Sequence, residues 1–474
     1  MDGGTESLRA GVFDLQGRPL AFASTAYQTR FPNPGWAEQD PRDWWTALGQ
    51  SVRQTVELAG VNGAEIAALA VDTTCCSVVA LDAKGEPLRP CLIWMDMRSA
   101  PQTEKVVATR DEALRVNSNG EGPVSAEWMV PKALWIKENE PEIFARATTI
   151  CEFQDYINYH LTGRLVSSIN NVSARWYYDR RRGGKPETLL EKLGLSALAE
   201  KWPAEVHDLG QVISGLTTRA AEHLGLPRDV PVVQGGADAF IGMVGLGVVR
   251  PGSLAFITGS SHLQLGLSDI PFHGTGIWGT YADALLPGLH AVEGGQTSTG
   301  SVINWLKNIY GVSDYEDLNR EAKELPPGSE GLIVQEHFQG NRTPHTDPQS
   351  RGAFHGLTLK YGRAHLFRAT IEGIAFGSEL ILETMRQNGF EPDRIVMAGG
   401  ATRSELWLQV HADVSKLPLT LTQVADAPAL GCAILAAVGA GLYADVQTAV
   451  EHMVKVTRVI EPDPSTHSAY QPFY

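Results

Sequence analysis

The stretch from residue 232 to 262 constrains the fold and the chemistry of this 474-residue chain more than any other. An apolar run ends in Gly235-Gly236-Ala237-Asp238, and a second run, 254–257, ends in Thr258-Gly259-Ser260-Ser261. Short apolar runs bounded by glycine are typical of buried strands, and chemistry in open α/β sheets collects just beyond strand ends. The pattern therefore predicts a catalytic carboxylate at Asp238 and a phosphate-binding turn at 258–261. Two ordinary Gly-rich turns are the alternative that the residues alone leave open.

Composition limits the classes of function. A length of 474 residues predicts two or more domains, and 43% hydrophobic with 20% charged residues is typical of a globular protein. The net charge of −15 argues against nucleic acid as a partner, although a small phosphorylated ligand fits a locally positive site. No apolar run approaches the roughly 20 residues of a membrane span, and the acidic Asp2 does not suit a signal peptide. We expect a cytoplasmic protein with no membrane partner.

The cysteines indicate the redox compartment rather than the chemistry. The chain has five, an odd number, and their positions match no metal-ligand spacing. Reduced cytosolic thiols explain them most simply, and we expect no catalytic cysteine.

Apolar periodicity predicts an α/β organisation throughout. Strands are expected at 7–13, 66–71 and 395–398, and a helix starts at Asp40-Pro41 with Trp44, Trp45, Leu48, Val52 and Val56 inward. A Gly and hydroxyl turn leads into a strand at residues 2–14 and again at 258–269. This weak internal repetition predicts two related domains that face each other, with a boundary near residues 240–250.

Five motifs now stand in order along the chain. They are Asp2-Gly3-Gly4-Thr5-Glu6-Ser7, Gly35-Trp36-Ala37-Glu38-Gln39-Asp40-Pro41, Gly236-Ala237-Asp238, Thr258-Gly259-Ser260-Ser261 and Gly399-Gly400-Ala401. As a set they resemble the FGGY family of carbohydrate kinases over nearly the full length. The resemblance implies a two-domain α/β fold of the actin/hexokinase/Hsp70 (ribonuclease H-like) type with an inter-domain cleft. It implies an N-terminal domain of residues 1–243 that binds sugar and a C-terminal domain of residues 244–474 that binds nucleotide.

Further stretches resemble the ribulokinase-like branch of the family. Asp72-Thr73-Thr74-Cys75-Cys76-Ser77 is similar to its Asp-x-Thr-Cys-Ser turn, and Trp94-Met95-Asp96-Met97-Arg98 to its Trp-x-Asp-His-Arg stretch, with Met97 in place of His. Residues 293–296 and 340–344 are also typical of that branch. The implied activity is ATP- and Mg²⁺-dependent phosphorylation of a sugar or polyol hydroxyl.

The resemblance assigns roles around the reacting phosphate. Phosphoryl transfer needs positioning, charge neutralisation and a group that accepts the hydroxyl proton. Asp238 is the implied general base, and a helix cap is its structural alternative. Asp2 would organise Mg²⁺ through water. The phosphate-binding residues would be Gly3, Gly4, Thr5, Thr258, Gly259 and Ser260. With two phosphate loops on two domains, closure would assemble the site and exclude water.

The resemblance also assigns the substrate contacts. Sugar-binding candidates are Thr74, Cys75, Asp96, Arg98, Arg175, Asp238, Glu293 and Gln296. Arg175 falls where related ribulokinases carry a Lys, and the two side chains are not interchangeable. For Asp96 and Arg98 a surface ion pair is the alternative. Trp128 is either a wall of the sugar site or core.

The nucleotide contacts follow in the same way. Gly399, Gly400 and Ala401 would let the backbone approach adenosine, and Asn341 would reach the phosphates or cap a turn. The small-residue helix 429–440 would pack beneath the nucleotide, or serve a helix–helix contact instead.

A pentulose is the implied substrate, with D-ribulose phosphorylated on its 5-hydroxyl as the first choice. D-Xylulose, L-ribulose and a polyol such as erythritol are alternatives, because a difference of one hydroxyl in the substrate pocket cannot be read from the sequence. A non-catalytic nucleotide-binding sensor and an actin- or Hsp70-like ATPase are the rivals from other classes. The family's first phosphate loop follows a full strand, whereas only Met1 precedes Asp2, so we expect a less stable first domain and a loosened Asp2. Homodimers are common in the family, and the sequence leaves the oligomeric state open.

Overall fold

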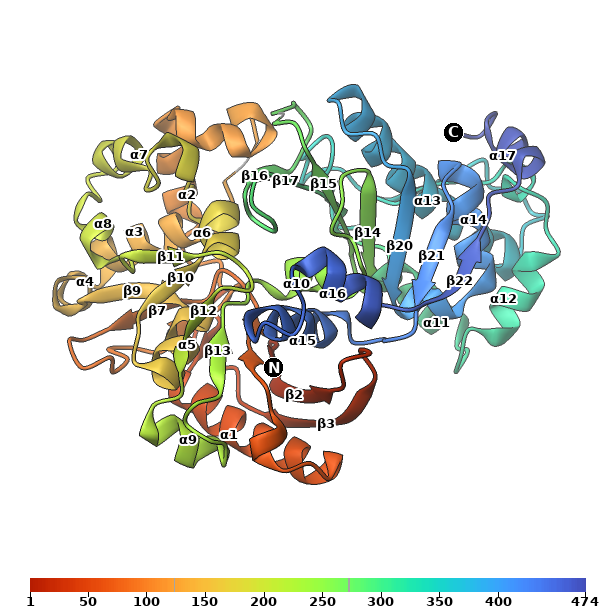
Figure 1. Cartoon of the computed structure of the whole chain (residues 1–474). Coiled ribbons are helices and arrows are strands. Elements are labelled where there is room, and N and C mark those ends of the chain that lie inside the picture. Colours follow the sequence, from red (N-terminus) through yellow and green to blue (C-terminus); the bar gives the residue numbers. More distant parts are fainter. Residues whose placement is uncertain (123, 272) are drawn as a thin grey trace. The chain divides into compact units, whose positions relative to one another are not determined.

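A computed structural model describes residues 1–122, 124–271 and 273–474 (Figure 1). The chain forms two compact units, each assembled from several stretches. Unit 1 consists of Met1–Val249, Tyr281–His290 and Asp426–Lys455, and unit 2 consists of Arg250–Thr280, Ala291–Ala425 and Val456–Tyr474. The cut expected between residues 243 and 244 lies near the main division, but two later stretches return to unit 1.

The strands in chain order are β1 (Asp2–Gly3), β2 (Ser7–Phe13), β3 (Pro19–Ala26), β4 (Glu38–Gln39), β5 (Leu69–Ala70), β6 (Asp72–Thr73), β7 (Val78–Leu81), β8 (Cys91–Leu92), β9 (Thr149–Glu152), β10 (Val166–Ser168), β11 (Glu205–His207), β12 (Val212–Gly215), β13 (Pro231–Val233), β14 (Ser253–Thr258), β15 (His262–Ser268), β16 (Gly279–Ala282), β17 (His290–Gln296), β18 (Ile333–Gln335), β19 (Ala353–His355), β20 (Arg394–Gly399), β21 (Leu419–Thr422) and β22 (Val456–Ile460).

The α-helices in chain order are α1 (Pro41–Ala59), α2 (Ala100–Ala108), α3 (Met129–Asn139), α4 (Pro141–Arg146), α5 (Phe153–Thr162), α6 (Ile169–Arg175), α7 (Glu187–Lys192), α8 (Ala197–Lys201), α9 (Thr218–Leu224), α10 (Asp238–Gly245), α11 (Gly300–Tyr310), α12 (Glu316–Lys323), α13 (Arg363–Gln387), α14 (Glu405–Ser415), α15 (Ala427–Gly439), α16 (Val446–Met453) and α17 (Pro464–Tyr470).

Strand pairing in unit 1 gathers three acidic residues. β1 is antiparallel to β2 and parallel to β6, with Asp2 opposite Asp72. β13 is parallel to β5, and beyond its end Ala237 forms a parallel bridge to Thr73. Because the carboxyl ends of parallel strands meet at one sheet edge, Asp2, Asp72 and Asp238 come together at that edge.

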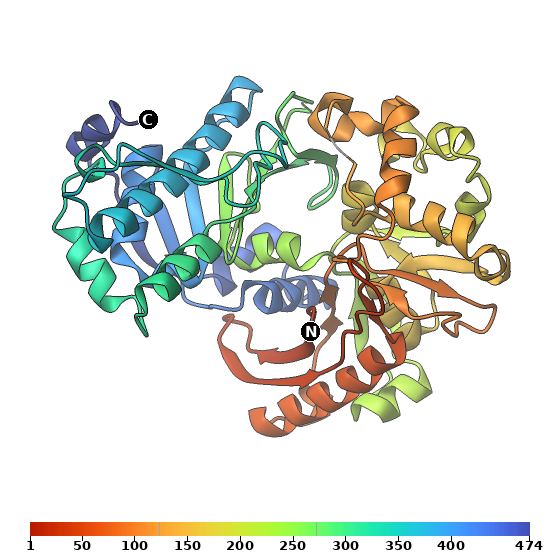
Figure 2. The ribbon, with the colours of Figure 1, turned by 180° about the vertical axis from the view of Figure 1, so that it is seen from behind.

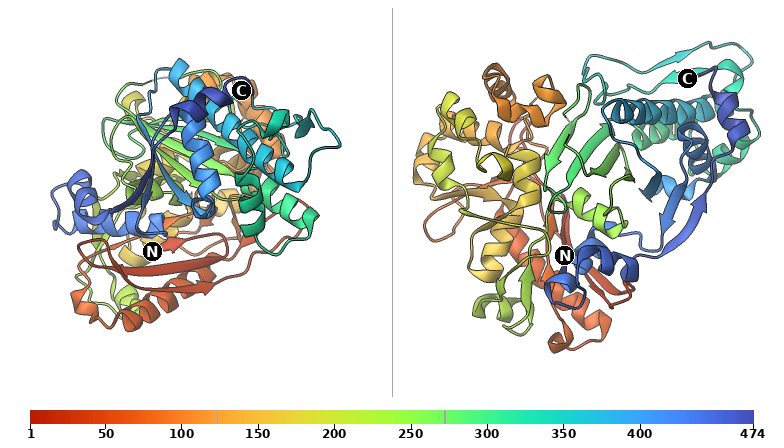
Figure 3. Two further views of the ribbon diagram at one scale, coloured as in Figure 1. Left: turned by 90° about the vertical axis from the view of Figure 1, so that its right-hand side faces the viewer. Right: turned by 45° about the horizontal axis from the view of Figure 1, so that its top comes forward.

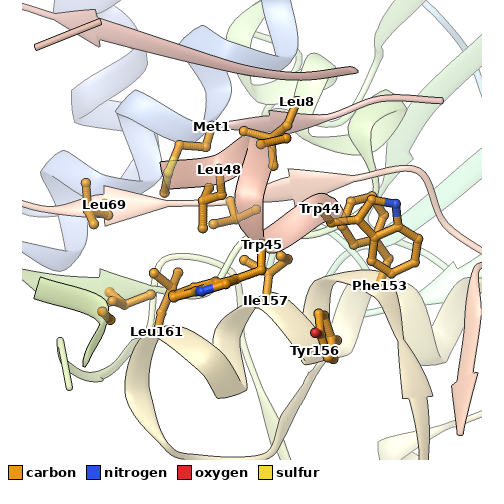
Figure 4. Packing of buried hydrophobic residues seen from close by; sticks show 14 of the residues in the cluster. Met1, Leu8, Trp44, Trp45, Leu48, Leu69, Phe153, Tyr156, Ile157 and Leu161 are labelled. Atoms are coloured by element: carbon orange, nitrogen blue, oxygen red, sulfur yellow. The ribbon is translucent and has the colours of Figure 1, made fainter. Parts of the chain in front are cut away.

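The core of unit 1 lies between α1, α5 and the β2–β3 hairpin. Helix α1 runs along the hairpin (Figure 2), begins after Asp40, whose side chain accepts the Arg42 N–H, and ends at a left-handed Gly60. The expected inward residues are buried, except that Val56 is half-buried. Trp44 stacks on Phe153 with ring centroids 3.6 Å apart (Figure 4). The predicted apolar face of α1 is therefore confirmed.

Helix α15 explains why residues 426–455 fold with unit 1. A Cβ on Gly431 would lie 2.1 Å from the Ile241 carbonyl oxygen, and one on Gly245 would lie 1.9 Å from that of Ala427. The backbones of α10 and α15 are thus in direct contact, which only glycine permits. Of the two explanations that the sequence left for these small residues, the structure shows the helix–helix contact.

A groove continues the line of β1 beyond the start of that strand. β1 has only two residues, and the buried Met1 amino group donates to the Ala70 carbonyl at 3.0 Å. The groove has a volume of about 350 Å³ and is lined mainly by apolar residues of β2, residues 66–70 and α15. The groove therefore exposes apolar surface of β2, of residues 66–70 and of α15.

Unit 2 is built on a twisted sheet of order β16-β17-β15-β14-β20-β21-β22. β14 is antiparallel to β15 and parallel to β20. Figure 3 shows β18 and β19 alongside the long helix α13. They pair antiparallel as a two-stranded ribbon within residues 326–361. Within the described parts of the chain, no helix is both long and apolar enough to cross a membrane.

Extending the chain ahead of Met1 tests the groove. We expect about six added residues of alternating apolar character to continue β1 and to raise the midpoint of thermal unfolding by about 5 °C or more, since each buried apolar side chain contributes about 1.5–3 kcal/mol. Scanning fluorimetry checks this against an extension of equal length made of Gly and Ser. Equal midpoints for the two extensions would show that the groove does not accept a strand.

Candidate active site

The first predicted phosphate loop is held in place by side chains from later in unit 1. The indole N–H of Trp94 donates to the Thr5 hydroxyl at 2.9 Å, and Gln39 donates to the Thr5 carbonyl at 2.6 Å. Tyr27 donates to the Gly4 carbonyl. A Cβ on Gly3 would lie 3.0 Å from atoms of Phe153 and Thr73, so the tight packing at this position favours glycine. The loop that the sequence predicted is therefore a fixed backbone rather than a loose terminus.

Several carboxylates surround this loop. Burial raises the pKa of the half-buried Asp2, and the nearby Asp426 raises it further, while the Met1 amino group and Arg9 lower it. Asp72 is fully buried, and burial raises its pKa well above the usual range. Arg9 forms an ion pair with Asp426. The cluster concentrates negative charge, which suits a cation at the edge of the sheet.

The carboxylates near the first phosphate loop suit Mg²⁺ only as part of a coordination shell that water and phosphate oxygens complete. Among the residues that the structure describes, no group of three or more His, Cys, Asp or Glu could hold a metal ion by itself. Mg²⁺ at phosphoryl-transfer sites usually takes one or two carboxylates and completes its shell with water and phosphate oxygens. Asp2, half-buried beside Asp426, can supply such a carboxylate.

Asp238 has the environment of a proton acceptor. It lies in the first turn of α10, and the N-cap position belongs to Ala237, so Asp238 is not the cap that the sequence offered as an alternative. Its Oδ1 accepts the Ala239 N–H at 2.7 Å. Burial and the charge of Asp2 raise its pKa to about 7, against the lowering effects of that hydrogen bond and of Arg175. A base with a pKa near the working pH is the efficient choice.

The turn at residues 72–77 follows β6 directly. Thr74 and Cys75 are half-buried, and the Thr74 hydroxyl lies 3.4 Å from that of Ser77. The sulfur atoms of Cys75 and Cys76 lie 3.7 Å apart, and every cysteine of the chain is a free thiol. The turn therefore presents one half-buried hydroxyl and one half-buried thiol, both on small side chains.

Asp96 and Arg98 form a buried ion pair, not the surface pair of the alternative reading. Arg98 donates from Nε and Nη2 to the Asp96 carboxylate at 2.7–3.0 Å, and Asp96 also accepts the Ala37 N–H at 2.6 Å. The guanidinium lies 3.7 Å from the ring centroid of Trp36 and 2.8 Å from Glu38. Met97, which departs from the related stretch, is 46% exposed. The departure therefore falls on a side chain outside this network.

Arg175 lies at the end of α6 and is buried. Its Nη1 donates to the Tyr281 hydroxyl at 2.8 Å, and the guanidinium lies 5.4 Å from that ring and 6.0 Å from the ring of Trp128. Its charge lowers the pKa of Asp238, so the two side chains are within electrostatic range. Trp128 is buried and belongs to the surroundings of Arg175.

In unit 2, the second phosphate loop and the glycine turn lie side by side. Thr258 is opposite Gly399 across the parallel β14–β20 pair. The Thr258 hydroxyl donates to the Ala398 carbonyl at 2.7 Å and accepts the Ala401 N–H at 3.4 Å. Gly259, Ser260 and Gly400 are exposed. Small loop residues at two adjacent strand ends are thus exposed, while the Gly259 N–H donates to the Ser261 carbonyl at 2.9 Å.

The other candidates of unit 2 already have protein partners. Glu293 accepts from Arg342 at 2.8 Å, with the guanidinium 4.1 Å from the ring of Trp278. The amide of Gln296 donates to Glu336 and to the Ile374 carbonyl and accepts from Ser378 at 2.7 Å. Asn341 accepts the His345 N–H at 2.8 Å, which is the turn-capping role that the sequence left open.

Comparison with known proteins decides the family. Residues 1–245 match the N-terminal domain of the FGGY family of carbohydrate kinases, and residues 254–440 match its C-terminal domain. The chain belongs to the FGGY family.

The relatives are sugar kinases with different substrates in their names. A ribulokinase of Mycolicibacterium smegmatis is 32% identical over 93% of this chain and 83% of its own length. A xylulose kinase of Staphylococcus epidermidis is 27% identical over 100% of this chain and 94% of its own. The solved xylulose kinase of Rhodospirillum rubrum has a TM-score of 0.86 at 29% identity, covering 100% of this chain and 95% of that one. The protein is a sugar kinase with the two-domain FGGY fold, and its sugar is left open.

The sequence analysis did not single out Lys132 or Glu152. Both side chains are fully buried and form hydrogen bonds with backbone groups of the 72–77 turn. Lys132 lies in α3, where the residues from Met129 to Ile136 are all buried. A lysine inside a helical stretch that is otherwise apolar on every face was the available signal, because such a charge needs internal partners. Glu152 had no comparable signal, since it ends a short strand.

Gly399→Ala should disrupt the glycine turn of this kinase. The residue has φ 100°, and its new Cβ would lie 1.9 Å from the Thr258 carbonyl oxygen. We expect a loss of about 2 kcal/mol or more, read as a lower midpoint in thermal unfolding. Gly400→Ala is the matched control, because there the nearest atom is 3.7 Å away. Equal midpoints for the two variants would contradict the steric argument.

Proposed function

We propose that this kinase phosphorylates the terminal hydroxyl of a pentulose, with D-ribulose converted to D-ribulose 5-phosphate as the first choice, and with ATP and Mg²⁺ as co-substrate and cofactor. The observation that carries the proposal is the position of Asp238 at a strand end beside Asp2, with a pKa raised to about 7. A carboxylate of that basicity next to a cation-binding carboxylate is the arrangement that phosphoryl transfer to an alcohol requires.

The proposed reaction uses Asp238 as general base. The O–H proton of the sugar passes to a carboxylate oxygen of Asp238, and the hydroxyl oxygen bonds to the γ-phosphorus of ATP. The bond from that phosphorus to the bridging oxygen of ADP breaks, and ADP leaves. Asp2 would hold Mg²⁺ through water, and the ion, when bound, neutralises charge on the phosphates.

The phosphate and nucleotide contacts divide between two sets of segments. The amides of Gly3 and Gly4 and the hydroxyl of Thr5 are proposed phosphate contacts of unit 1. Thr258, Gly259 and Ser260 have that proposed role in unit 2, with Gly399, Gly400 and Ala401 proposed to meet adenosine and Asn341 to shape the neighbouring turn. The exposure of Gly259, Ser260 and Gly400 at the ends of β14 and β20 supports these assignments.

For the sugar, the first proposed contacts are Thr74, Cys75 and Arg175. Thr74 and Cys75 are half-buried at a strand end, and Arg175 lies within electrostatic range of Asp238. The second group of proposed sugar contacts is Asp96, Arg98, Glu293 and Gln296. Hydrogen bonds to protein partners fix the orientation of these side chains before any sugar binds.

D-Ribulose is preferred because the 72–77 and 94–98 stretches are similar to ribulokinases. D-Xylulose, L-ribulose and erythritol remain alternatives, since the relatives carry both the ribulokinase and the xylulose kinase names. Five free thiols support a reducing, cytoplasmic location.

Asp238→Asn tests the base. We expect the rate of sugar-dependent ADP release from ATP and Mg²⁺ to fall by about 100-fold or more, on whichever sugar of a panel of pentuloses, pentoses and polyols the wild type accepts. The exposed Asp229, replaced by Asn, is the matched control. A variant that keeps more than a tenth of the wild-type rate would exclude Asp238 as base, and silence of the wild type on every sugar would favour the non-catalytic sensor.

The pH profile tests the same residue independently. Because the folded-state pKa of Asp238 is raised to about 7 and the base acts only when deprotonated, kcat/KM for the sugar should rise as pH increases through about 7 and level off above it. Below that pH we expect about a tenfold fall per pH unit. Initial rates between pH 5.5 and 9 in buffers of constant ionic strength give the profile, and an inflection near 4 would contradict it.

A further inference from the structure

Cys76 has a backbone conformation that its residue type disfavours. Its φ is 63°, in the left-handed region that residues other than glycine rarely adopt. The residue lies between the proposed sugar contacts Thr74 and Cys75 and the strand β7, so its conformation sets the path of the turn. A non-glycine residue stays in this region only when its surroundings hold it there.

Glu152 holds the amide side of the Cys76 residue. Its Oε1 accepts the Cys76 N–H at 3.2 Å, and its Oε2 accepts the Ser77 N–H at 3.0 Å. The indole N–H of Trp176 donates to the same carboxylate at 2.8 Å. The carboxylate is fully buried, so these three donors replace the water that it lacks.

Lys132 holds the carbonyl side. Its ammonium donates to the Cys76 carbonyl at 2.8 Å and to the Ile93 carbonyl at 2.6 Å, and it lies 3.4 Å from the Trp94 carbonyl. It too is fully buried. Burial raises the pKa of Glu152 to about 7, and the charge of Lys132 opposes that rise. The two side chains therefore compensate each other electrically while each binds the same residue.

We propose that Lys132 and Glu152 are positioning residues that clamp Cys76 from its N–H and its C=O, and so fix the sugar-binding turn of this kinase. Neither side chain touches the substrate. The clamp keeps the Thr74 and Cys75 side chains at one position before the sugar binds, so these side chains lose less conformational entropy on binding.

The clamp also joins this turn to two neighbouring segments. Lys132 binds the carbonyls of 93 and 94, and the Trp94 indole in turn donates to Thr5 of the first phosphate loop. Glu152 binds Trp176, the residue after Arg175. One pair of buried charges therefore fixes the relative positions of the proposed sugar turn, the 93–98 stretch and the end of α6.

Glu152→Gln is the main test. Glutamine keeps the size but turns one acceptor oxygen into an NH₂ group that faces a backbone N–H, so the turn loses one of its two bonds. We expect KM for the sugar to rise about tenfold or more, with KM for ATP unchanged within about twofold, which is the signature of lost ground-state positioning. Lys132→Met should also raise KM for the sugar. This substitution removes all hydrogen bonds of the ammonium group, so the midpoint of thermal unfolding of the variant is recorded as well.

Cys76→Gly supplies a rescue that separates positioning from general damage. Glycine adopts the left-handed conformation without strain, so the double variant Cys76→Gly/Glu152→Gln should recover a sugar KM within about threefold of Cys76→Gly alone. Glu379→Gln is the matched control. Burial likewise raises the pKa of this carboxyl to about 7, but it pairs with Arg386 in unit 2, and its loss should leave the sugar KM unchanged.

The inference rests on the proposed sugar site, so a readout without turnover is included. Alkylation by iodoacetamide, followed by peptide mass spectrometry, measures each thiol separately. Glu152→Gln should speed labelling of the buried Cys76 about tenfold or more, because the turn opens more often, while labelling of the buried Cys432 stays at its wild-type rate.

Each outcome decides one of the two proposals. Equal rises in the KM for sugar and for ATP, or no rescue by Cys76→Gly, would overturn the clamp and leave the kinase proposal standing. A wild type without sugar turnover would overturn the proposed function, and the labelling rates would still decide on the clamp. Faster labelling of Cys432 together with Cys76 would show general unfolding and would also overturn it.

Discussion

Parallel strand pairing is the constraint on which both proposed phosphate loops depend. In unit 1, β1 lies beside β6 with Asp2 opposite Asp72, and in unit 2, β14 lies beside β20 with Thr258 opposite Gly399. In each unit the first strand of the pair also forms an antiparallel hairpin, and the loop of that hairpin carries the glycine motif. The loop amides bond locally in both hairpins, since the Gly4 N–H donates to the Ser7 carbonyl at 3.0 Å and the Gly259 N–H to the Ser261 carbonyl at 2.9 Å. The repeat seen weakly in the sequence is thus a repeat of this local arrangement.

The cost of gathering carboxylates at one edge is offset locally. Burial and the charge of Asp2 raise the pKa values of Asp72 and Asp238, and burial with the charge of Asp426 raises that of Asp2. The Met1 amino group lowers the pKa values of Asp2 and Asp72. Like charges in a low-dielectric site cannot all ionise at neutral pH without a counterion. The burial and like-charge repulsion that make the cluster a suitable place for a cation also raise the pKa of Asp238 to about 7. A proton acceptor for an alcohol needs a pKa in that range. The proposed metal site and the raised pKa of Asp238 would therefore have one physical origin.

The sequence predicted those parts of the fold and site whose signals are local. The glycines of the two loops, the amphipathic face of α1 and the strand-end position of Asp238 depend on short-range spacing, which is readable without a fold. The network around Asp96 was not readable, because its partners Trp36 and Glu38 are about 60 residues away in sequence. Helix α15 had two equal interpretations, since small residues permit close approach to a ligand or to a helix alike. Gln296 shows the same limit: its hydrogen-bond partners come from β18–β19 and α13, which tertiary folding alone brings to it.

Buried charges serve two different purposes in unit 1. Those at the strand ends belong to the proposed metal site and the proposed base. Those beneath the 72–77 turn, Lys132 and Glu152, bind backbone groups of Cys76 from its two sides. A glycine at position 76 would reach the same left-handed geometry with less strain. A cysteine reaches it only when it is held from both sides, so the two buried side chains define the shape of the turn. Because burying charged groups costs free energy even when they are hydrogen-bonded, the retention of these two side chains beneath the turn is better explained by the geometry that they impose on it than by the free energy of folding.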